Sequence, residues 1–240
     1  SGSARSTSRI EVGTAVVPTY PRHPVVMAQQ ALTVQSALGG RFTLGIPFER
    51  PVRHMREYLE VVLPLVRGEA AALDGELYKV RARVGVRTDP VPVVIAALGP
   101  RMLEVAGELV DGTILSWVGH KTIETHIAPR IGKAAANAGR QAPRIIAGLP
   151  ISVTDDRDAA REAFAPSVTG YGALPSYRAM FDIEGAERPA DVALFGDEAA
   201  LDAELRRLED AGATDFQAQV VNSGPGSSTR TLEFLASRIT

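Results

Sequence analysis

The chain has 240 residues, of which 45% are hydrophobic and 22% are charged, and its formal net charge is −2. This size suits one large globular domain or two small ones, and the near-neutral charge argues against nucleic acid or an anionic membrane as the main partner. With no cysteine, the sequence excludes disulfides, thiolate zinc sites and cysteine nucleophiles. No apolar run approaches the ~20 residues of a membrane span and no signal peptide precedes the first predicted strand, so we expect a cytoplasmic protein.

Strands and helices alternate in the first third of the chain. A strand is predicted over Arg9–Val17, where a Pro-rich stretch ends it, and a helix over Val25–Leu38, which ends at Gly39-Gly40. The elements expected next are a strand over Arg41–Ile46, a helix over Arg50–Val66, and a small hairpin or excursion over Leu77–Val86.

The stretch Val91–Arg101 joins a strand to a helix through a tight turn. Its β-branched residues predict a buried strand, and Leu98-Gly99-Pro100 leads directly into a helical pattern. Proline is favoured in the first turn of a helix, and glycine lets the backbone approach a ligand. Because the free N–H groups of a helix N-terminus attract anions, this turn is a candidate phosphate site. An ordinary strand-to-helix connection is the alternative.

The second half of the chain continues the alternation. Strands are expected over residues 112–117, 145–153 and 215–221, and helices over residues 122–138, 201–211 and 231–239. Pro129 is expected to kink the first of these helices, and a further helix is expected from Asp155 with Thr154 as its N-cap. The interval Phe164–Gly196 is rich in glycine, proline and tyrosine and is too long for an ordinary connection, so we interpret it as an insertion or lid.

This alternation of strands and helices, repeated six times, predicts an α/β protein with a parallel sheet. A (β/α)₈ TIM barrel is the expected fold, and an open doubly wound sheet is the alternative. No G-x-G-x-x-G follows a strand, which disfavours the doubly wound option. Six units do not close an eight-stranded barrel, so either two βα units are missing at the N-terminus or the fold is different.

Three stretches resemble the luciferase-like monooxygenase superfamily. Residues 13–24, with residues 27–30 and 39–45 after them, resemble its third and fourth βα units. Residues 96–102 resemble its cofactor-phosphate turn, and residues 107–114 resemble its Ala-Gly-x-x-Asp-Gly strand signature. Within the superfamily, the sequence is most similar to the actinobacterial branch that uses the deazaflavin coenzyme F420. The resemblance extends over nearly the whole chain.

The resemblance implies a single bacterial-luciferase-like (β/α)₈ barrel domain over residues 1–240, with its site at the C-terminal ends of the strands. The chain departs from the family in two places. The first two βα units, roughly 50 or more residues, are absent before Ser8. An active-site loop that normally follows the strand Arg41–Gly45 is also absent, because the chain continues at once into Ile46–Arg50. We expect this loop to be disordered and absent from the sequence for that reason.

The same resemblance implies which residues hold the cofactor. The wall under the tricyclic ring is expected at Ala15, Val16, Pro18 and Thr19, with a non-prolyl cis peptide bond between Ala15 and Val16. The phosphate turn is expected at Ala97, Leu98, Gly99 and Pro100, where the backbone N–H groups of Leu98 and Gly99 hold the phosphate of the coenzyme tail.

Three further residues are expected at the mouth of the same site. Gly45 is expected to let the cofactor approach its strand, and Ser116 and Trp117 lie at the end of the next predicted strand. Trp117 is the only tryptophan in the chain. It either packs in the core or stacks on the cofactor ring.

The four histidines have different expected roles. His120 lies on a loop after a strand and is the one candidate for a group that reaches substrate, whereas His23 is expected to be structural at a helix entry. His54 and His126 are expected on helix surfaces, and no pair of histidines has metal-ligand spacing on a common face. Asn222–Ser228 is a rival phosphate site because barrels often bind phosphate after their last strands.

These patterns predict an F420-dependent oxidoreductase that transfers a hydride between C5 of the deazaflavin and a small organic substrate under the segment Phe164–Gly196. The first alternative is an FMN-dependent luciferase-like monooxygenase on the same barrel, which consumption of oxygen would distinguish. The second alternative is a non-catalytic cofactor-binding homologue. A homodimer is expected from the family. The sequence has no G-x-S-x-G motif and no clear carboxylate pair at strand ends, so it does not support a hydrolase.

Overall fold

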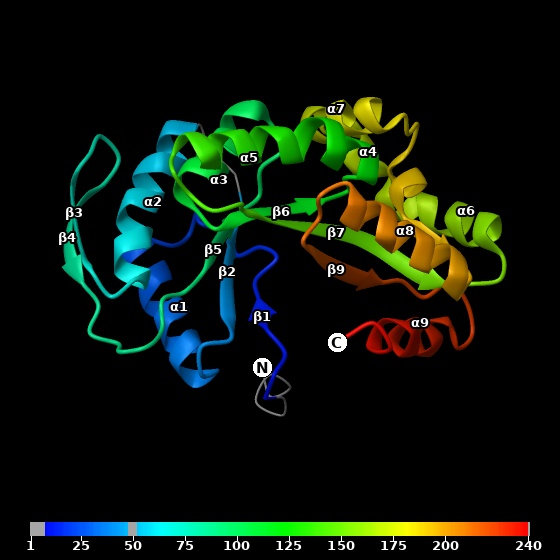
Figure 1. Ribbon diagram of the computed structural model, residues 1–240, viewed down its shortest axis with the longest axis horizontal. Helices are drawn as coiled ribbons and strands as arrows, with labels where there is room; N and C mark the ends of the chain where they lie inside the picture. Colours follow the sequence, from blue (N-terminus) through cyan, green and yellow to red (C-terminus); the bar gives the residue numbers. More distant parts are fainter. Residues whose placement is uncertain (1–7, 48–51, 240) are drawn as a thin grey trace. The chain divides into compact units, whose positions relative to one another are not determined.

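The computed structural model describes residues 8–47 and 52–239 (Figure 1). Residues 48–51, close to where we expect a loop to be missing from the sequence, therefore lie outside the described residues. The chain forms two compact units, the first built from residues up to Ile114 together with Ile131–Pro143, and the second from Leu115–Arg130 together with residues from Arg144 onward. Each unit is described by itself. In the described ranges, no helix is long and apolar enough to cross a membrane.

The first unit is built on parallel strands in the order β1-β2-β5-β6. Their bounds are Val12–Gly13 for β1, Phe42–Ile46 for β2, Val93–Ile95 for β5 and Gly112–Ser116 for β6, whose last residues pass into the second unit. Every residue of β2 and β5 is buried. Near-continuous apolar strands of this kind are typical of parallel sheets that are covered on both faces.

Helices and a hairpin pack around these strands. The helices are α1 (Pro24–Ala37), α2 (Val52–Val66) and α3 (Pro100–Leu109), and the antiparallel hairpin consists of β3 (Ala70–Asp74) and β4 (Lys79–Arg83). Helix α2 packs against α1, α3 and β3. The side chain of Gln35 on α1 is buried, and both ends of its amide are satisfied, by donation to the Pro90 carbonyl and by acceptance from the Phe42 N–H. This amide fixes α1 against β2 and the segment before β5 because an unpaired buried polar group is costly.

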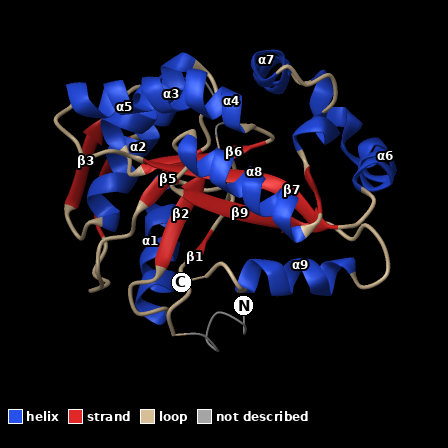
Figure 2. Ribbon diagram, turned by 45° about the vertical axis from the view of Figure 1, so that its right-hand side comes forward, coloured by secondary structure: helices blue, strands red, loops and turns tan. Residues whose placement is uncertain are grey.

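The second unit is built around the long strand β7 (Arg144–Val153), which pairs in parallel with β9 (Asp215–Val220) and β8 (Leu194–Gly196). Its other elements are α4 (His120–Thr122), the π-helical turn Ile123–Ile127, α6 (Arg157–Val168), α7 (Pro175–Glu184), α8 (Glu198–Asp210) and α9 (Ser227–Ala236) (Figure 2). Helix α5 (Ala128–Asn137) continues the π-helical turn, and most of it belongs to the first unit. The buried hydroxyl of Thr231 accepts the Val153 N–H and so attaches α9 to β7.

The parallel β/α architecture that the sequence predicts is confirmed, and several elements begin where expected. Helix α3 starts at Pro100, and α1 differs from its predicted bounds by one residue at each end. The strand predicted over Arg9–Val17 is wrong in length, because only Val12–Gly13 pairs with β2. Beyond Gly13 the chain leaves the ladder, and no further strand forms before Pro18.

Two expectations for the second unit need correction. Helix α6 does not begin at Asp155 with Thr154 as its cap. It begins at Arg157, because the Asp156 carboxylate accepts the Ala159 N–H as the N-cap. The interval Phe164–Gly196 is not irregular either, since it contains the end of α6, two 3₁₀ segments, α7 and the strand β8. Whether α6 and α7 act as a lid stays a prediction.

An ion pair connects the two long strands of the second unit. Arg144 on β7 donates from Nη2 to Oδ1 of Asp215 on β9 at 2.6 Å and from Nε to Oδ2 at 3.1 Å. Burial by itself raises the pKa of Asp215, but the hydrogen bonds from Arg144 and Thr214 outweigh burial and lower it. The charged carboxylate therefore stabilises the folded state above its unfolded pKa, and this contribution is lost as pH falls through the folded pKa.

We expect Asp215→Asn to lower the free energy of unfolding by about 1–3 kcal/mol at pH 7, because it removes the carboxylate charge from the paired hydrogen bonds with Arg144. The difference from the parent protein should shrink as pH falls below about 4, where the carboxyl begins to protonate. Urea unfolding followed by circular dichroism across this pH range measures both effects. The control is Asp182→Asn, which removes an exposed pair with Arg178 on α7 and should cost less. Equal losses in the two variants would contradict the assignment.

Candidate functional site

The segment after β1 is tied to Gly45 on β2. The predicted cis peptide bond between Ala15 and Val16 is present. On one side of it, the Thr14 hydroxyl donates to the Gly45 carbonyl and accepts the Gly45 N–H, both at 2.9 Å. On the other side, the Val17 N–H donates to the same carbonyl at 3.0 Å. The expected ring wall is thus fixed to a central strand at both of its ends.

Glycine at position 45 is explained by a close approach of the chain after β1. A Cβ atom at this position would lie 1.9 Å from the Thr14 carbonyl oxygen and 3.4 Å from Cγ1 of Val16. The space on that side is filled by the chain after β1, so this close approach by itself requires glycine at position 45. Contact between Gly45 and a cofactor by another face stays a prediction.

The end of β5 carries the turn that the sequence predicts to bind phosphate. Ala97 is buried, and the buried Thr113 hydroxyl on β6 donates to the Ile95 carbonyl at 3.0 Å, which holds the strand end in place. Gly99 is the N-cap residue of α3 in extended conformation and has no side-chain cap. In the described part of the chain, the N–H groups of Gly99 and Arg101 donate to no backbone oxygen.

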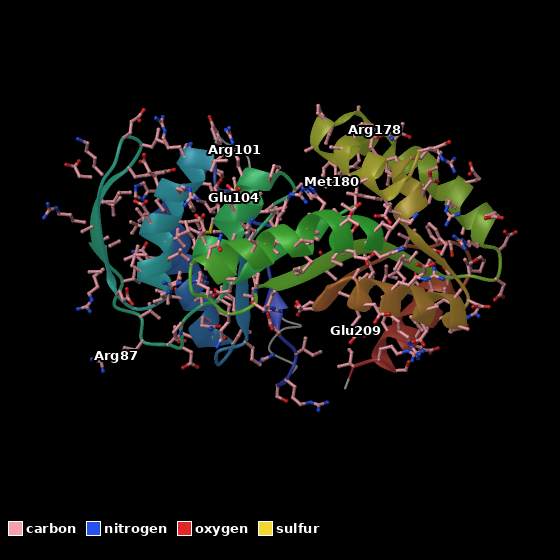
Figure 3. The ribbon with its side chains drawn as sticks, turned by 45° about the horizontal axis from the view of Figure 1, so that its top comes forward. Arg87, Arg101, Glu104, Arg178, Met180 and Glu209 are labelled. Atoms are coloured by element: carbon pink, nitrogen blue, oxygen red, sulfur yellow. The ribbon has the colours of Figure 1, made fainter. Side chains whose placement is uncertain are left out.

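This turn fits a phosphate group. A Cβ atom at Gly99 would meet nothing within 4 Å, so the described residues leave space beside this turn. Two free donors at the positive end of a ten-residue helix are a suitable anion site. Arg101, in the first turn of α3, carries a cationic side chain close to the same helix end (Figure 3). The role of Leu98 stays a prediction.

Asp111, the acidic residue of the Asp-Gly signature, has a structural role. Its carboxylate accepts the Val93 N–H at 2.8 Å, and its own N–H donates to the Val93 carbonyl at 2.8 Å. Arg140 donates to the neighbouring Val110 carbonyl at 2.8 Å. Asp111 therefore joins the start of β6 to β5, the strand that leads into the predicted phosphate turn.

Thr19 lines a cavity of about 270 Å³ together with aromatic side chains. His54 Nε2 lies 3.1 Å from the Tyr78 hydroxyl in this cavity, so the half-buried His54 contacts another side chain beside its helix. Burial and the neighbouring Tyr78 raise the pKa of Tyr58, which keeps its phenol neutral at physiological pH. The cavity thus combines hydrogen-bonding groups with an apolar aromatic wall.

In the second unit, Trp117 is an aromatic core residue with an unusual backbone. Its φ is 62° and its side chain is 5% exposed. The indole stacks on Phe164 at 6.3 Å between ring centroids and contacts Tyr171 at 4.9 Å. Protein rings therefore cover much of this side chain, and its stacking on a cofactor stays a prediction, as does the role of Ser116.

His120 lies beside a carboxylate that sequence reasoning missed. Glu184, at the end of α7, accepts the Thr122 N–H and the Thr122 hydroxyl at 2.8 Å each, and its Oε1 lies 3.8 Å from His120 Nδ1. Arg178 and Met180 belong to the same helix (Figure 3). A Cβ at Gly119 would lie 2.4 Å from this carboxylate, so a larger residue there would displace the Glu184 side chain.

The other candidates are occupied by structural roles. His23 is the N-cap of α1 and accepts the Val25 N–H through Nδ1, which confirms its expected place at a helix entry. The rival phosphate loop is bonded to itself, because Asn222 accepts the Gly224 N–H and the Ser227 hydroxyl. Over residues 8–47 and 52–239, no group of three or more His, Cys, Asp or Glu side chains is arranged for a metal ion.

Sequence reasoning missed Thr14, Thr113 and Glu184. Thr14 and Thr113 stand next to residues that were predicted, but nothing local signals that a threonine hydroxyl bonds a neighbouring strand. Glu184 is followed by Gly185, the αL residue at the end of α7. That glycine marks the end of the helix, but it does not indicate which helix start the carboxylate caps.

Comparison with known proteins is consistent with this geometry. A sequence model of the luciferase-like monooxygenase family matches residues 1–223. The 5,10-methylenetetrahydromethanopterin reductase of Archaeoglobus fulgidus is 33% identical over 177 residues, which are 67% of this chain and 53% of that protein. The F420-dependent glucose-6-phosphate dehydrogenase of Beutenbergia cavernae is 31% identical over 215 residues, which are 81% of this chain and 63% of that protein. The chain thus spans between about half and two thirds of the length of these relatives.

The fold is that of a solved coenzyme F420-dependent tetrahydromethanopterin reductase from Methanopyrus kandleri. The two structures superpose with a TM-score of 0.82 at 22% sequence identity, over 98% of this chain and 84% of that one. This likeness supports the expected barrel-type fold over the doubly wound alternative.

We expect Gly45→Ala to lower the free energy of unfolding by about 2 kcal/mol or more, because the added methyl group collides with the Thr14 backbone. Urea unfolding at pH 7 measures the loss. The matched control is Gly85→Ala, where a Cβ meets nothing within 4 Å and only a small change is expected. A Gly45→Ala variant as stable as the control variant would contradict the close approach of the two segments.

Proposed function

The chain belongs to the luciferase-like monooxygenase family, and from this premise we propose that it is an F420-dependent oxidoreductase acting on a small organic substrate. The observation that carries the proposal is the turn at Gly99. There, among the described residues, the N–H groups of Gly99 and Arg101 donate to no backbone oxygen, and a Cβ at Gly99 would meet nothing within 4 Å. Relatives and a solved neighbour whose names include F420 support the choice of coenzyme.

The residues have separate roles in this proposal. Gly99 and Arg101 bind the phosphate of the coenzyme tail through their N–H groups. The wall at Ala15, Val16, Pro18 and Thr19 supports one face of the ring and keeps water from it. When bound, the deazaflavin supplies hydride chemistry at C5, and the protein orients it toward the substrate.

The cavity beside Thr19 is our candidate for the substrate side of the site. His54 and Tyr78 place a hydrogen-bonded pair in it, and such a pair can hold a proton close to a substrate oxygen. The neutral phenol of Tyr58 donates to the Arg22 carbonyl at 3.3 Å and serves as part of the wall. His120 remains the other candidate for a group that touches substrate.

Two alternatives follow from the same family. An FMN-dependent monooxygenase would use the same barrel and consume oxygen, and a non-catalytic homologue would bind a cofactor without turnover. Titration of the apoprotein with F420 and separately with FMN, followed by ligand fluorescence, separates the F420 proposal from the FMN alternative. We expect saturable binding of F420 with a Kd in the range of about 1–100 μM and weaker binding of FMN. The reverse preference would favour the monooxygenase. Binding of neither F420 nor FMN would contradict the proposal and both alternatives.

The phosphate turn is tested by a charge placed at its open position. We expect Gly99→Asp to weaken F420 binding about tenfold or more, because a carboxylate there repels the phosphate. Gly99→Asn is the matched control, with the same shape and no charge. Both variants should retain the thermal stability of the parent protein, because a Cβ at Gly99 meets nothing within 4 Å. Equal F420 affinity in the two variants would place the phosphate elsewhere.

A further inference from the structure

A cavity in the second unit contains two arginine side chains that the proposed function does not use. It has a volume of about 240 Å³ and lies between α6, the end of α7, β8 and α8; we call it the α6–α8 cavity. Arg157 and Arg161 line it from α6, where their spacing of four residues places them on one face of the helix. None of the residues predicted to hold the cofactor lines this cavity, whereas His120, the second candidate for a group that touches substrate, does.

Arg161 carries an unsatisfied buried donor. Its Nε is buried without a hydrogen-bond partner, and its side chain as a whole is 16% exposed. The carboxylate that it approaches is Asp158, at 3.9 Å from Nη1, and that residue is 92% exposed. A buried polar atom without a partner is uncommon in native proteins and calls for an explanation such as an absent ligand.

The acidic groups around the cavity are engaged elsewhere. Glu184 accepts hydrogen bonds at the start of α4, and Asp191 accepts the Arg188 N–H and pairs with the Arg188 guanidinium. Glu204 pairs with Arg207 at 2.8 Å. Arg157 makes no hydrogen bond or ion pair with any residue in the described ranges. Among the described residues, the acidic side chains that line the cavity are thus bonded to groups other than Arg157 and Arg161.

We propose that the α6–α8 cavity binds a small oxyanion, a phosphate or carboxylate group, through Arg157 and Arg161. The planar guanidinium group presents paired N–H donors that match two oxygens of such a group. A spherical ion such as chloride does not match this pair of donors. The cavity walls include Leu149, Phe195 and Leu208, so they also accept a short apolar body. The volume lies below the ~300 Å³ typical of larger ligand pockets, and the ligand is accordingly a small organic phosphate or acid.

The binding test uses the 240-residue chain without cofactor, so that it is independent of the F420 proposal. Inorganic phosphate and succinate are the probes, each titrated at constant ionic strength with sodium chloride as the balance. We expect one or both to raise the Tm saturably, as a ligand that binds only the folded state must. The probe with the lower Kd identifies whether phosphate or carboxylate is preferred. A parent protein that responds to neither, or equally to chloride, overturns the proposal.

Three variants locate the effect. Arg161→Met keeps the length of the side chain without its donors, and Arg157→Gln changes an exposed residue whose loss should not disturb folding. We expect each to weaken anion binding about tenfold or more. The control is Arg206→Gln on α8, which removes a charge that pairs with Asp202 and does not line the cavity. It should bind the anion as the parent does.

A second readout separates a binding role from a structural one. Without anion, Arg161→Met should be at least as stable as the parent protein, because it removes an unpaired buried donor. A large loss of stability together with an unchanged anion response would assign Arg161 to packing and overturn the proposal. If Arg161→Met does not fold, Arg157→Gln decides alone, and an unchanged affinity in that variant overturns the proposal equally. F420 affinity should be unaffected by all three variants.

Discussion

The Thr14 hydroxyl holds both backbone groups of Gly45, and the arrangement of the proposed cofactor site depends on this contact. The ladder between β1 and β2 ends at Gly13, so side-chain and backbone bonds to Gly45 replace it over the next residues. The same strand pairs with β5 at Ile46 and Ile95. One buried strand therefore sets the positions of the ring wall on one side and the phosphate turn on the other.

Paired buried polar groups hold the rest of this frame. Gln35, Asp111 and Thr113 each bond backbone groups of a neighbouring segment, which removes the cost of burying them and fixes the register of that segment. Against this background, the Nε of Arg161 stands out among the described residues as a buried nitrogen without a partner. The contrast is the physical basis for assigning the α6–α8 cavity to a ligand and not to the fold.

Local sequence signals predicted much of the fold and part of the site. The start of α3 at Pro100 and the bounds of α1 follow from proline preference, glycine stops and helical periodicity, which act within a few residues. The strand predicted over Arg9–Val17 was longer than the observed one, because β-branched residues favour extended backbone whether or not a neighbouring strand is paired. The start of α6 was misplaced because Thr154 and Asp156 are both good caps, and only the chain path selects between them.

By itself, the sequence determined the order of strands and helices, the strand-turn-helix at Gly99 and the resemblance to one family, because each depends on residues close together in the chain. The tertiary structure alone decided why Gly45 must be glycine, which helix start Glu184 caps, and that Arg157 and Arg161 share a cavity with β8 and α8. Thr14 lies 31 residues from Gly45, and Glu184 lies 62 from Thr122. Contacts over such separations depend on the path of the whole chain, which no local pattern specifies.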